Sequence, residues 1–131
     1  MARKASEKKR SRNRELGMRG EEAAAHYLRR RGYDIVDRNW TCPVGEADIV
    51  AMDEKFLIFV EVKTRTKLET GLPEEAVDAE RRHRYELIAA YYLRDHDYVD
   101  MPVRFDVVAL LVCGPDRAFI RHHINAFGSS E

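Results

Sequence analysis

The chain has 131 residues, of which 44% are hydrophobic and 35% charged. This length suits one domain with a sizeable core and excludes a second full domain, and its apolar runs are far shorter than the roughly 20 residues that cross a bilayer. The two cysteines form no CxxC pair and no apolar export signal is visible, so we expect reduced thiols in a cytoplasmic protein with no membrane partner.

Charge is unevenly distributed, although 23 Lys and Arg balance 23 Asp and Glu. Residues 1–14 carry seven Lys and Arg, among them Lys8, Lys9 and Arg10, against one Glu. Such a segment cannot bury enough apolar surface to order itself, so we expect a flexible basic arm over 1–14 and a folded domain over 15–131. The arm either attracts phosphates or acts only as a solubilising terminus.

Hydrophobic periodicity predicts the elements that follow the arm. Apolar residues at helical spacing indicate a helix over 15–31, which Gly32 ends. The later elements expected by the same reasoning are strands over 34–40, 46–53 and 56–64, a helix over 74–93, and strands over 104–112 and 118–124. The order α-β-β-β-α-β-β predicts a mixed α/β fold, with a central five-stranded sheet flanked by helices.

The second and third strands form a hairpin whose pairing follows from counting. If residues 54–55 make a two-residue loop, Asp53 faces Phe56 and, further back along the strands, Asp48 faces Glu61. A slip of one residue would place charge among the apolar side chains, so the hydrophobic pattern itself selects this register.

The two faces of this hairpin differ in character. One face is uniformly apolar and consists of Ala47, Ile49, Ala51, Phe56, Ile58, Val60 and Val62. On the other face charge gathers at the open end, in Glu46, Asp48, Glu61 and Lys63. Three carboxylates a few ångströms apart repel one another, so this corner needs a cation.

Two interpretations of the acidic corner remain open. Hard oxygen ligands at this spacing suit Mg²⁺ or Mn²⁺ and a phosphodiester substrate. In that case Asp48 and Glu61 hold the metal, the backbone carbonyl of Val62 completes its shell, and Lys63 orients water or stabilises developing charge. Alternatively, Lys63 pairs with Glu61 or Glu46 across a solvated end of the sheet.

Basic residues near this corner offer contacts to phosphates. Arg65 and Lys67 follow the third strand, and Arg81 and Arg84 lie one turn apart on one face of the second helix. The alternative for the helical pair is pairing with acids of its own helix.

Asp106 lies in a strand that is otherwise apolar, where an ionised side chain without a partner is costly. We expect it to pair with Arg104 or Arg65 for structural reasons, although a place beside the metal acids is also open.

An ordered set of motifs resembles a known family. Asp48, followed by Glu61-Val62-Lys63 on the next strand, resembles the D…ExK core of the restriction-endonuclease-like superfamily. The chain as a whole resembles the YraN-like family of uncharacterised bacterial proteins, related to archaeal Holliday-junction resolvases, in motifs that include Leu16-Gly17, Gly20-Glu21, Gly45-Glu46-Ala47-Asp48-Ile49-Val50 and Asn125-Ala126-Phe127.

This resemblance implies a metal-dependent nuclease domain that acts on DNA, including branched or structured DNA. Asp48, Glu61 and Lys63 then occupy the catalytic positions, and Glu21 of the first helix is close enough to join them. Glu46 and Arg65 are expected beside the metal acids. A two-fold dimer is also implied, because junction enzymes cut two strands symmetrically. The alternatives are a nucleic-acid-binding or assembly module that kept the fold and lost turnover, and a protein-interaction domain.

Overall fold

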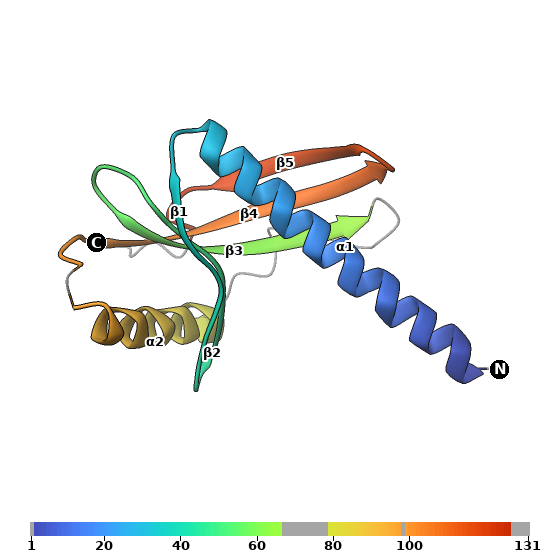
Figure 1. Ribbon diagram of the computed structural model, residues 1–131, viewed down its shortest axis with the longest axis horizontal. Helices are drawn as coiled ribbons and strands as arrows, with labels where there is room; N and C mark the ends of the chain where they lie inside the picture. Colours follow the sequence, from blue (N-terminus) through green and yellow to red (C-terminus); the bar gives the residue numbers. More distant parts are fainter. Residues whose placement is uncertain (1, 67–78, 98, 127–131) are drawn as a thin grey trace.

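The computed structural model describes residues 2–66, 79–97 and 99–126, which form two helices and five strands (Figure 1). In chain order these are α1 (Ala2–Arg30), β1 (Asp34–Cys42), β2 (Gly45–Met52), β3 (Leu57–Thr66), α2 (Ala79–Asp95), β4 (Val103–Gly114) and β5 (Arg117–His123). The predicted order of elements is confirmed. The predicted start of the second helix at residue 74 lies outside the described residues.

The five strands form one mixed sheet in the order β1-β2-β3-β4-β5. β3 and β4 are parallel, and the other neighbouring strands are antiparallel. Parallel neighbours cannot be joined by a tight hairpin, which is why the chain passes through α2 between them. Neither helix is apolar enough over a sufficient length to cross a membrane, within the residues that the structure describes.

Each helix covers one face of the sheet with its own apolar cluster. Ala24 and Leu28 of α1 are buried on residues of β2, β3 and β4. Tyr85, Ile88 and Tyr92 of α2 are buried on the opposite face. Full burial of such large side chains stabilises the fold by about 1.5–3 kcal/mol each, so these two clusters fix where both helices lie.

The hairpin between β2 and β3 has the predicted register. Ile49 pairs with Val60 and Met52 with Leu57, while the Asp53 N–H donates to the Phe56 carbonyl across 3.1 Å. This confirms that the alternation of apolar and polar residues is enough to select the pairing of these strands.

The first helix begins much earlier than predicted. Residues 2–14 belong to the predicted flexible basic arm and are helical: they form the first half of α1, which projects away from the sheet in Figure 1. This stretch contains neither Gly nor Pro and consists mostly of good helix formers, so it continues a helix that packing has already nucleated. The end of the helix is as predicted: Gly32 has a φ of 93°, and the Tyr33 N–H donates to the Leu28 carbonyl across 3.0 Å.

Candidate metal centre

Asp48 lies where β2 separates from β3. The backbone pairs of the hairpin run from Met52 with Leu57 as far as Ile49 with Val60. At the next position the Asp48 side chain replaces the ladder, because its Oδ2 accepts a hydrogen bond from the Val62 N–H across 2.8 Å. Asp48 is therefore held at the mouth of the hairpin by the strand that also carries Glu61.

The alternation of side chains along β2 breaks at this same residue. Ile49 and Ala51 lie in the cluster beneath α1, as predicted, but Ala47 lies with Val50 in the cluster beneath α2. The prediction that Ala47 shares a face with Ile49 is therefore wrong. The change of face coincides with the position at which the ladder between β2 and β3 ends, while the pairing of β2 with β1 continues.

Glu21 reaches the site because α1 crosses β3 at a glycine. A Cβ on Gly20 would overlap the Thr64 side chain, so only glycine lets the two backbones come this close. Glu21, the next residue, accepts a hydrogen bond from the Asn39 side chain of β1 across 2.8 Å. Burial, together with the nearby charge of Glu46, raises the pKa of Glu21. Glu21 therefore lies near Glu46, and its part in catalysis stays a prediction.

Three carboxylates form the tightest acidic group among the described residues. Oxygen atoms of Glu21, Glu46 and Asp48 all lie within 4.8 Å of one another. Glu46 was expected only beside the metal acids, but one of its carboxylate oxygens lies within 4.8 Å of oxygens of both Asp48 and Glu21. Glu61 is not a member of this group.

Glu61 is almost fully buried, with 7% of its surface exposed. Its Oε1 faces two cations, Lys63 Nζ at 3.6 Å and Arg81 Nε at 3.4 Å. Its Oε2 is buried and accepts no hydrogen bond among the described residues. The pairing of Lys63 with Glu61 is thus present, but it satisfies only one of the two carboxylate oxygens.

Asp48 is electrostatically linked to all three other acids. Burial raises its pKa to about 7; the hydrogen bond from Val62 opposes this rise, and the charges of Glu21, Glu61 and Glu46 add to it. Burial also raises the pKa of Tyr85, with further contributions from Glu61 and then Asp48, so this α2 side chain lies near both acids. Tyr85 was not predicted, and only its position one turn after Arg81 indicates it.

The residues present suit a divalent cation with oxygen ligands. The site contains the carboxylates of Asp48 and of three neighbouring acids, Glu21, Glu46 and Glu61. The buried Oε2 of Glu61 accepts no hydrogen bond among the described residues. Mg²⁺ and Mn²⁺ take such ligands and retain waters, and a cavity of about 300 Å³ with Glu21, Val62 and Arg65 in its wall gives those waters room. The Val62 carbonyl remains a predicted ligand.

The residues predicted to contact nucleic acid lie in different surroundings. Arg81 is directed at Glu61 and is only 19% exposed, whereas Arg84 is exposed and its aliphatic stem lies near Gly45 of β2. Lys8 and Arg10 are exposed on the projecting half of α1, and Lys9 belongs to the same helical stretch. Arg65 is half-buried in the wall of the cavity. Lys67 lies outside the described residues.

Asp106 is fully buried in a polar network away from the acidic group. Arg104 donates to both of its carboxylate oxygens across 2.9 Å, His122 Nε2 lies 2.8 Å away, and the Asn125 N–H donates across 2.9 Å. Burial would raise its pKa, but the hydrogen bonds from His122 and Arg104 outweigh burial and keep the pKa below its usual value. Of the two predicted partners, Arg104 is the one found.

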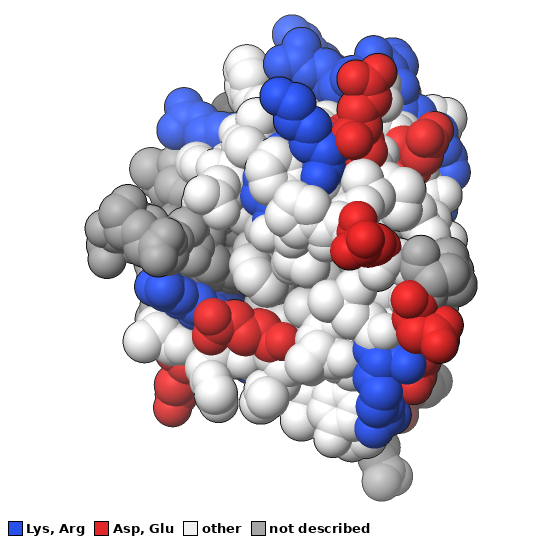
Figure 2. Space-filling model, turned by 90° about the vertical axis from the view of Figure 1, so that its left-hand side faces the viewer, with Lys and Arg blue, Asp and Glu red and all other residues white. Residues whose placement is uncertain are grey.

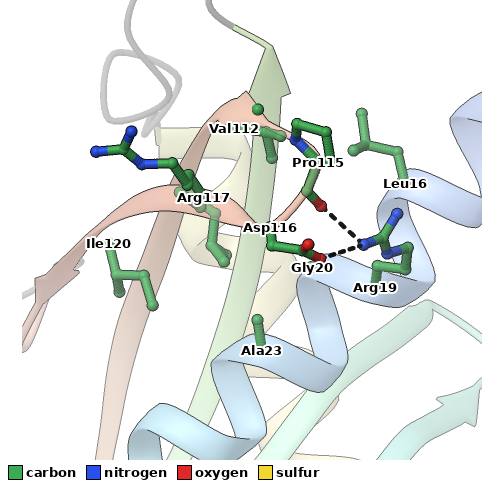
Figure 3. A pocket seen from close by; sticks show the side chains of 12 residues that line it. Leu16, Arg19, Gly20, Ala23, Val112, Pro115, Asp116, Arg117 and Ile120 are labelled. Atoms are coloured by element: carbon green, nitrogen blue, oxygen red, sulfur yellow. Dashed lines mark hydrogen bonds and ion pairs between the residues drawn. The ribbon is translucent and has the colours of Figure 1, made fainter.

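A second cavity, of about 460 Å³, lies between α1 and the turn that joins β4 to β5 (Figure 3). At its edge Arg19 donates to the Pro115 carbonyl across 3.0 Å and lies 3.9 Å from the Asp116 carboxylate. These contacts tie α1 to the far end of the sheet immediately before Gly20 and Glu21. They therefore help to hold Glu21 in place.

One face of the molecule has mixed charge. Figure 2 shows Lys and Arg gathered at the top of the face in view, with Asp and Glu among and below them. This face is therefore not a uniform basic surface.

Comparison with known proteins identifies relatives that span nearly the whole chain. A model of the uncharacterised protein family UPF0102 matches residues 20–110, which include the four acids described above. A UPF0102 protein of Geobacter sulfurreducens is 45% identical over 115 residues, covering 88% of this chain and 90% of the relative. One from Renibacterium salmoninarum is 43% identical over 82% of this chain and 92% of its own length, and one from Rhodococcus jostii is 45% identical over 86% and 95%. The chain therefore belongs to the UPF0102 family, as its YraN-like motifs predicted.

Proposed function

We propose that this chain is a divalent-metal-dependent phosphodiesterase that hydrolyses DNA, including branched or structured DNA. The observation that carries the proposal is the buried Oε2 of Glu61, which accepts no hydrogen bond within the described structure and lies beside an acidic group centred on Asp48. Leaving such an oxygen unpaired destabilises a fold by about 1–3 kcal/mol, and a bound cation would offset that loss.

The acids of the site supply the ligands. Asp48 and Glu61 would hold the metal, with Glu21 and Glu46 close enough to Asp48 to complete the oxygen set. When bound, the ion supplies a Lewis acid for the phosphate and a water of lowered pKa.

Lys63, beside Glu61, and Arg65, in the wall of the cavity that Glu21 also lines, supply positive charge for binding a phosphate. Burial lowers the pKa of Lys63, which makes its ammonium a stronger proton donor toward charge that develops on phosphate oxygens. Arg65 shares the wall of the 300 Å³ cavity with Glu21 and Val62, so a phosphate in that cavity would meet its guanidinium. The D…ExK resemblance supports the same reaction.

Cleavage assays on a panel of DNAs test the proposal. Purified chain with Mg²⁺ or Mn²⁺ should cut at least one of a duplex, a flap and a four-way junction. Asp48→Asn and Glu61→Gln should each lower the rate by at least about 100-fold, since even loss of a residue that only orients a metal ligand costs 10–100-fold. Glu54→Gln, in the exposed hairpin loop, is the matched control and should cut at the normal rate.

Two outcomes would count against hydrolysis. Cleavage that persists in both acid variants would place the reaction elsewhere or assign it to a contaminant. DNA binding without cleavage under any metal condition would favour the non-catalytic binding module instead.

A further inference from the structure

Arg81 links helix α2 to the candidate site through its ion pair with Glu61. Its Nε lies 3.4 Å from Glu61 Oε1, the same oxygen that Lys63 approaches, while Glu61 Oε2 accepts no hydrogen bond among the described residues. One carboxylate oxygen thus faces two cations, while the other accepts no hydrogen bond among the described residues.

The position of Arg81 follows from how α2 packs. Tyr85 and Ile88, one and two turns after Arg81, are buried on the sheet. Because residues four positions apart lie on the same face of a helix, Arg81 also points toward the sheet. The neighbouring Arg82 and Arg84 are exposed. The packing of α2 therefore directs Arg81 at Glu61, although 19% of its side chain is still exposed to solvent.

We infer that Arg81 changes partner during binding: it neutralises Glu61 while no divalent ion is present, and it binds a phosphate of the DNA once the ion occupies the acidic group. The inference rests on the proposed function, since it needs a metal at Glu61 and a phosphate nearby.

Electrostatics gives the direction of each half of this exchange. A divalent ion beside Glu61 brings two positive charges close to a guanidinium and an ammonium, so Arg81 and the ion compete for one carboxylate. Lys63 is anchored two residues from Glu61 on the same strand, whereas Arg81 extends from another element on a longer side chain. Arg81 thus approaches Glu61 from a different element and on the longer side chain, and guanidinium groups bind phosphate oxygens in a bidentate manner.

Linkage then makes metal and DNA cooperative. Without DNA, Arg81 opposes metal binding; with DNA, the displaced guanidinium gains a phosphate partner, so each ligand raises the affinity for the other by the same factor. Arg81 in this role is a positioning residue for the phosphate.

The test compares Arg81→Gln with Arg82→Gln, a matched change at an exposed site one residue away. Calorimetric titration of Mn²⁺ into the DNA-free protein should show affinity about tenfold higher for Arg81→Gln than for wild type. Affinity for a short duplex with cleavage-resistant phosphorothioate linkages is then measured with and without Mn²⁺. Mn²⁺ should raise it about tenfold in wild type and in Arg82→Gln, but much less in Arg81→Gln. Arg81→Lys, which keeps the charge, should lie closer to wild type in both measurements.

The failures of the two ideas are distinguishable. If wild type binds no Mn²⁺, the proposed metal function fails and the exchange fails with it. If wild type binds Mn²⁺, but Arg81→Gln matches Arg82→Gln in metal affinity or in the effect of Mn²⁺ on DNA affinity, the metal site stands and the exchange of partners is refuted. A melting curve for each variant confirms that the fold is intact.

Discussion

Asp48 combines two roles whose energies conflict. Its carboxylate accepts the Val62 N–H where β2 and β3 separate, which stabilises the local structure. Burial and three neighbouring acids nevertheless disfavour its ionised form. Keeping a disfavoured charge at this position lowers the stability of the metal-free protein, a common cost of a binding site.

Removing that charge should stabilise the metal-free protein. Asp48→Asn keeps an acceptor for the Val62 N–H and abolishes the repulsion. Because folding raises the pKa of Asp48 to about 7, wild type loses stability as pH rises from about 4 through 7, and the variant does not share this loss. We expect Asp48→Asn to be more stable by about 2 kcal/mol at pH 8, with the gap closing near pH 4, in urea unfolding without divalent ions. A variant that is less stable than wild type at pH 8 would show that the charge is compensated.

Asp106 should behave in the opposite way. Asp106→Asn removes the carboxylate that accepts two hydrogen bonds from the mostly buried Arg104 side chain, so we expect a loss of about 3 kcal/mol at neutral pH. The pKa of Asp106 is lowered by folding, so its contribution is present above the unfolded pKa and is lost as pH falls through the folded value. The stability gap between wild type and variant should therefore narrow in acid. Asp34→Asn, at an exposed position, should change stability little; an equal loss in both would refute the role of the network.

At the scale of elements, the contact of α1 with β3 sets the position of Glu21. Gly20 lies directly against Thr64, whereas a Cβ on Gly17, one turn earlier in the same helix, would meet nothing within 4 Å. These two glycines form a natural matched pair.

Gly20→Ala should destabilise the fold and weaken metal binding, because α1 must move away from Thr64 and carry Glu21 with it. Gly17→Ala should instead stabilise the protein by about 0.5–1 kcal/mol, since alanine is the better helix former. Urea unfolding and Mn²⁺ titration of both variants check this. Equal effects of the two substitutions would mean that helix propensity alone decides, and that the contact does not position the acid.

Sequence patterns predicted some elements and missed others for physical reasons. The register of β2 with β3 was predictable because a one-residue slip puts charge into a core. The break at Asp48 was not, because it depends on a side chain that replaces a backbone pair. The first half of α1 was missed because low hydrophobicity indicates the absence of a core contact and says nothing about helix propensity.

The candidate site, too, was predictable from the sequence only in part. Asp48, Glu61 and Lys63 could be grouped from strand register alone, since they lie on adjacent strands. The contacts of Arg81 with Glu61 and of Asn39 with Glu21 each join a helix to a strand, and no local sequence pattern specifies them.

For the whole molecule, charge is separated between the projecting half of α1 and the rest. Residues 1–14 hold seven Lys and Arg against one Glu in a chain of zero net charge. If this half of α1 contacts the phosphates of DNA, a chain that begins at residue 15 should bind DNA with a weaker salt dependence, since each phosphate contact adds about 0.9 to the log–log slope. Its Mn²⁺ affinity should be unchanged. An unaltered slope would show that the basic stretch makes no phosphate contact.

Helix α1 and the mouth of the β2–β3 hairpin carry Glu21, Glu46 and Asp48, and Arg81 at the start of α2 contacts Glu61. The central proposal is that Asp48 and Glu61 hold a divalent ion. Anomalous diffraction from crystals soaked in MnCl₂ tests it most directly. We predict a manganese peak in contact with both Asp48 and Glu61 in wild type and none there in Asp48→Asn. Crystals that show no peak at these two carboxylates, or manganese bound only to exposed acids elsewhere, would contradict it.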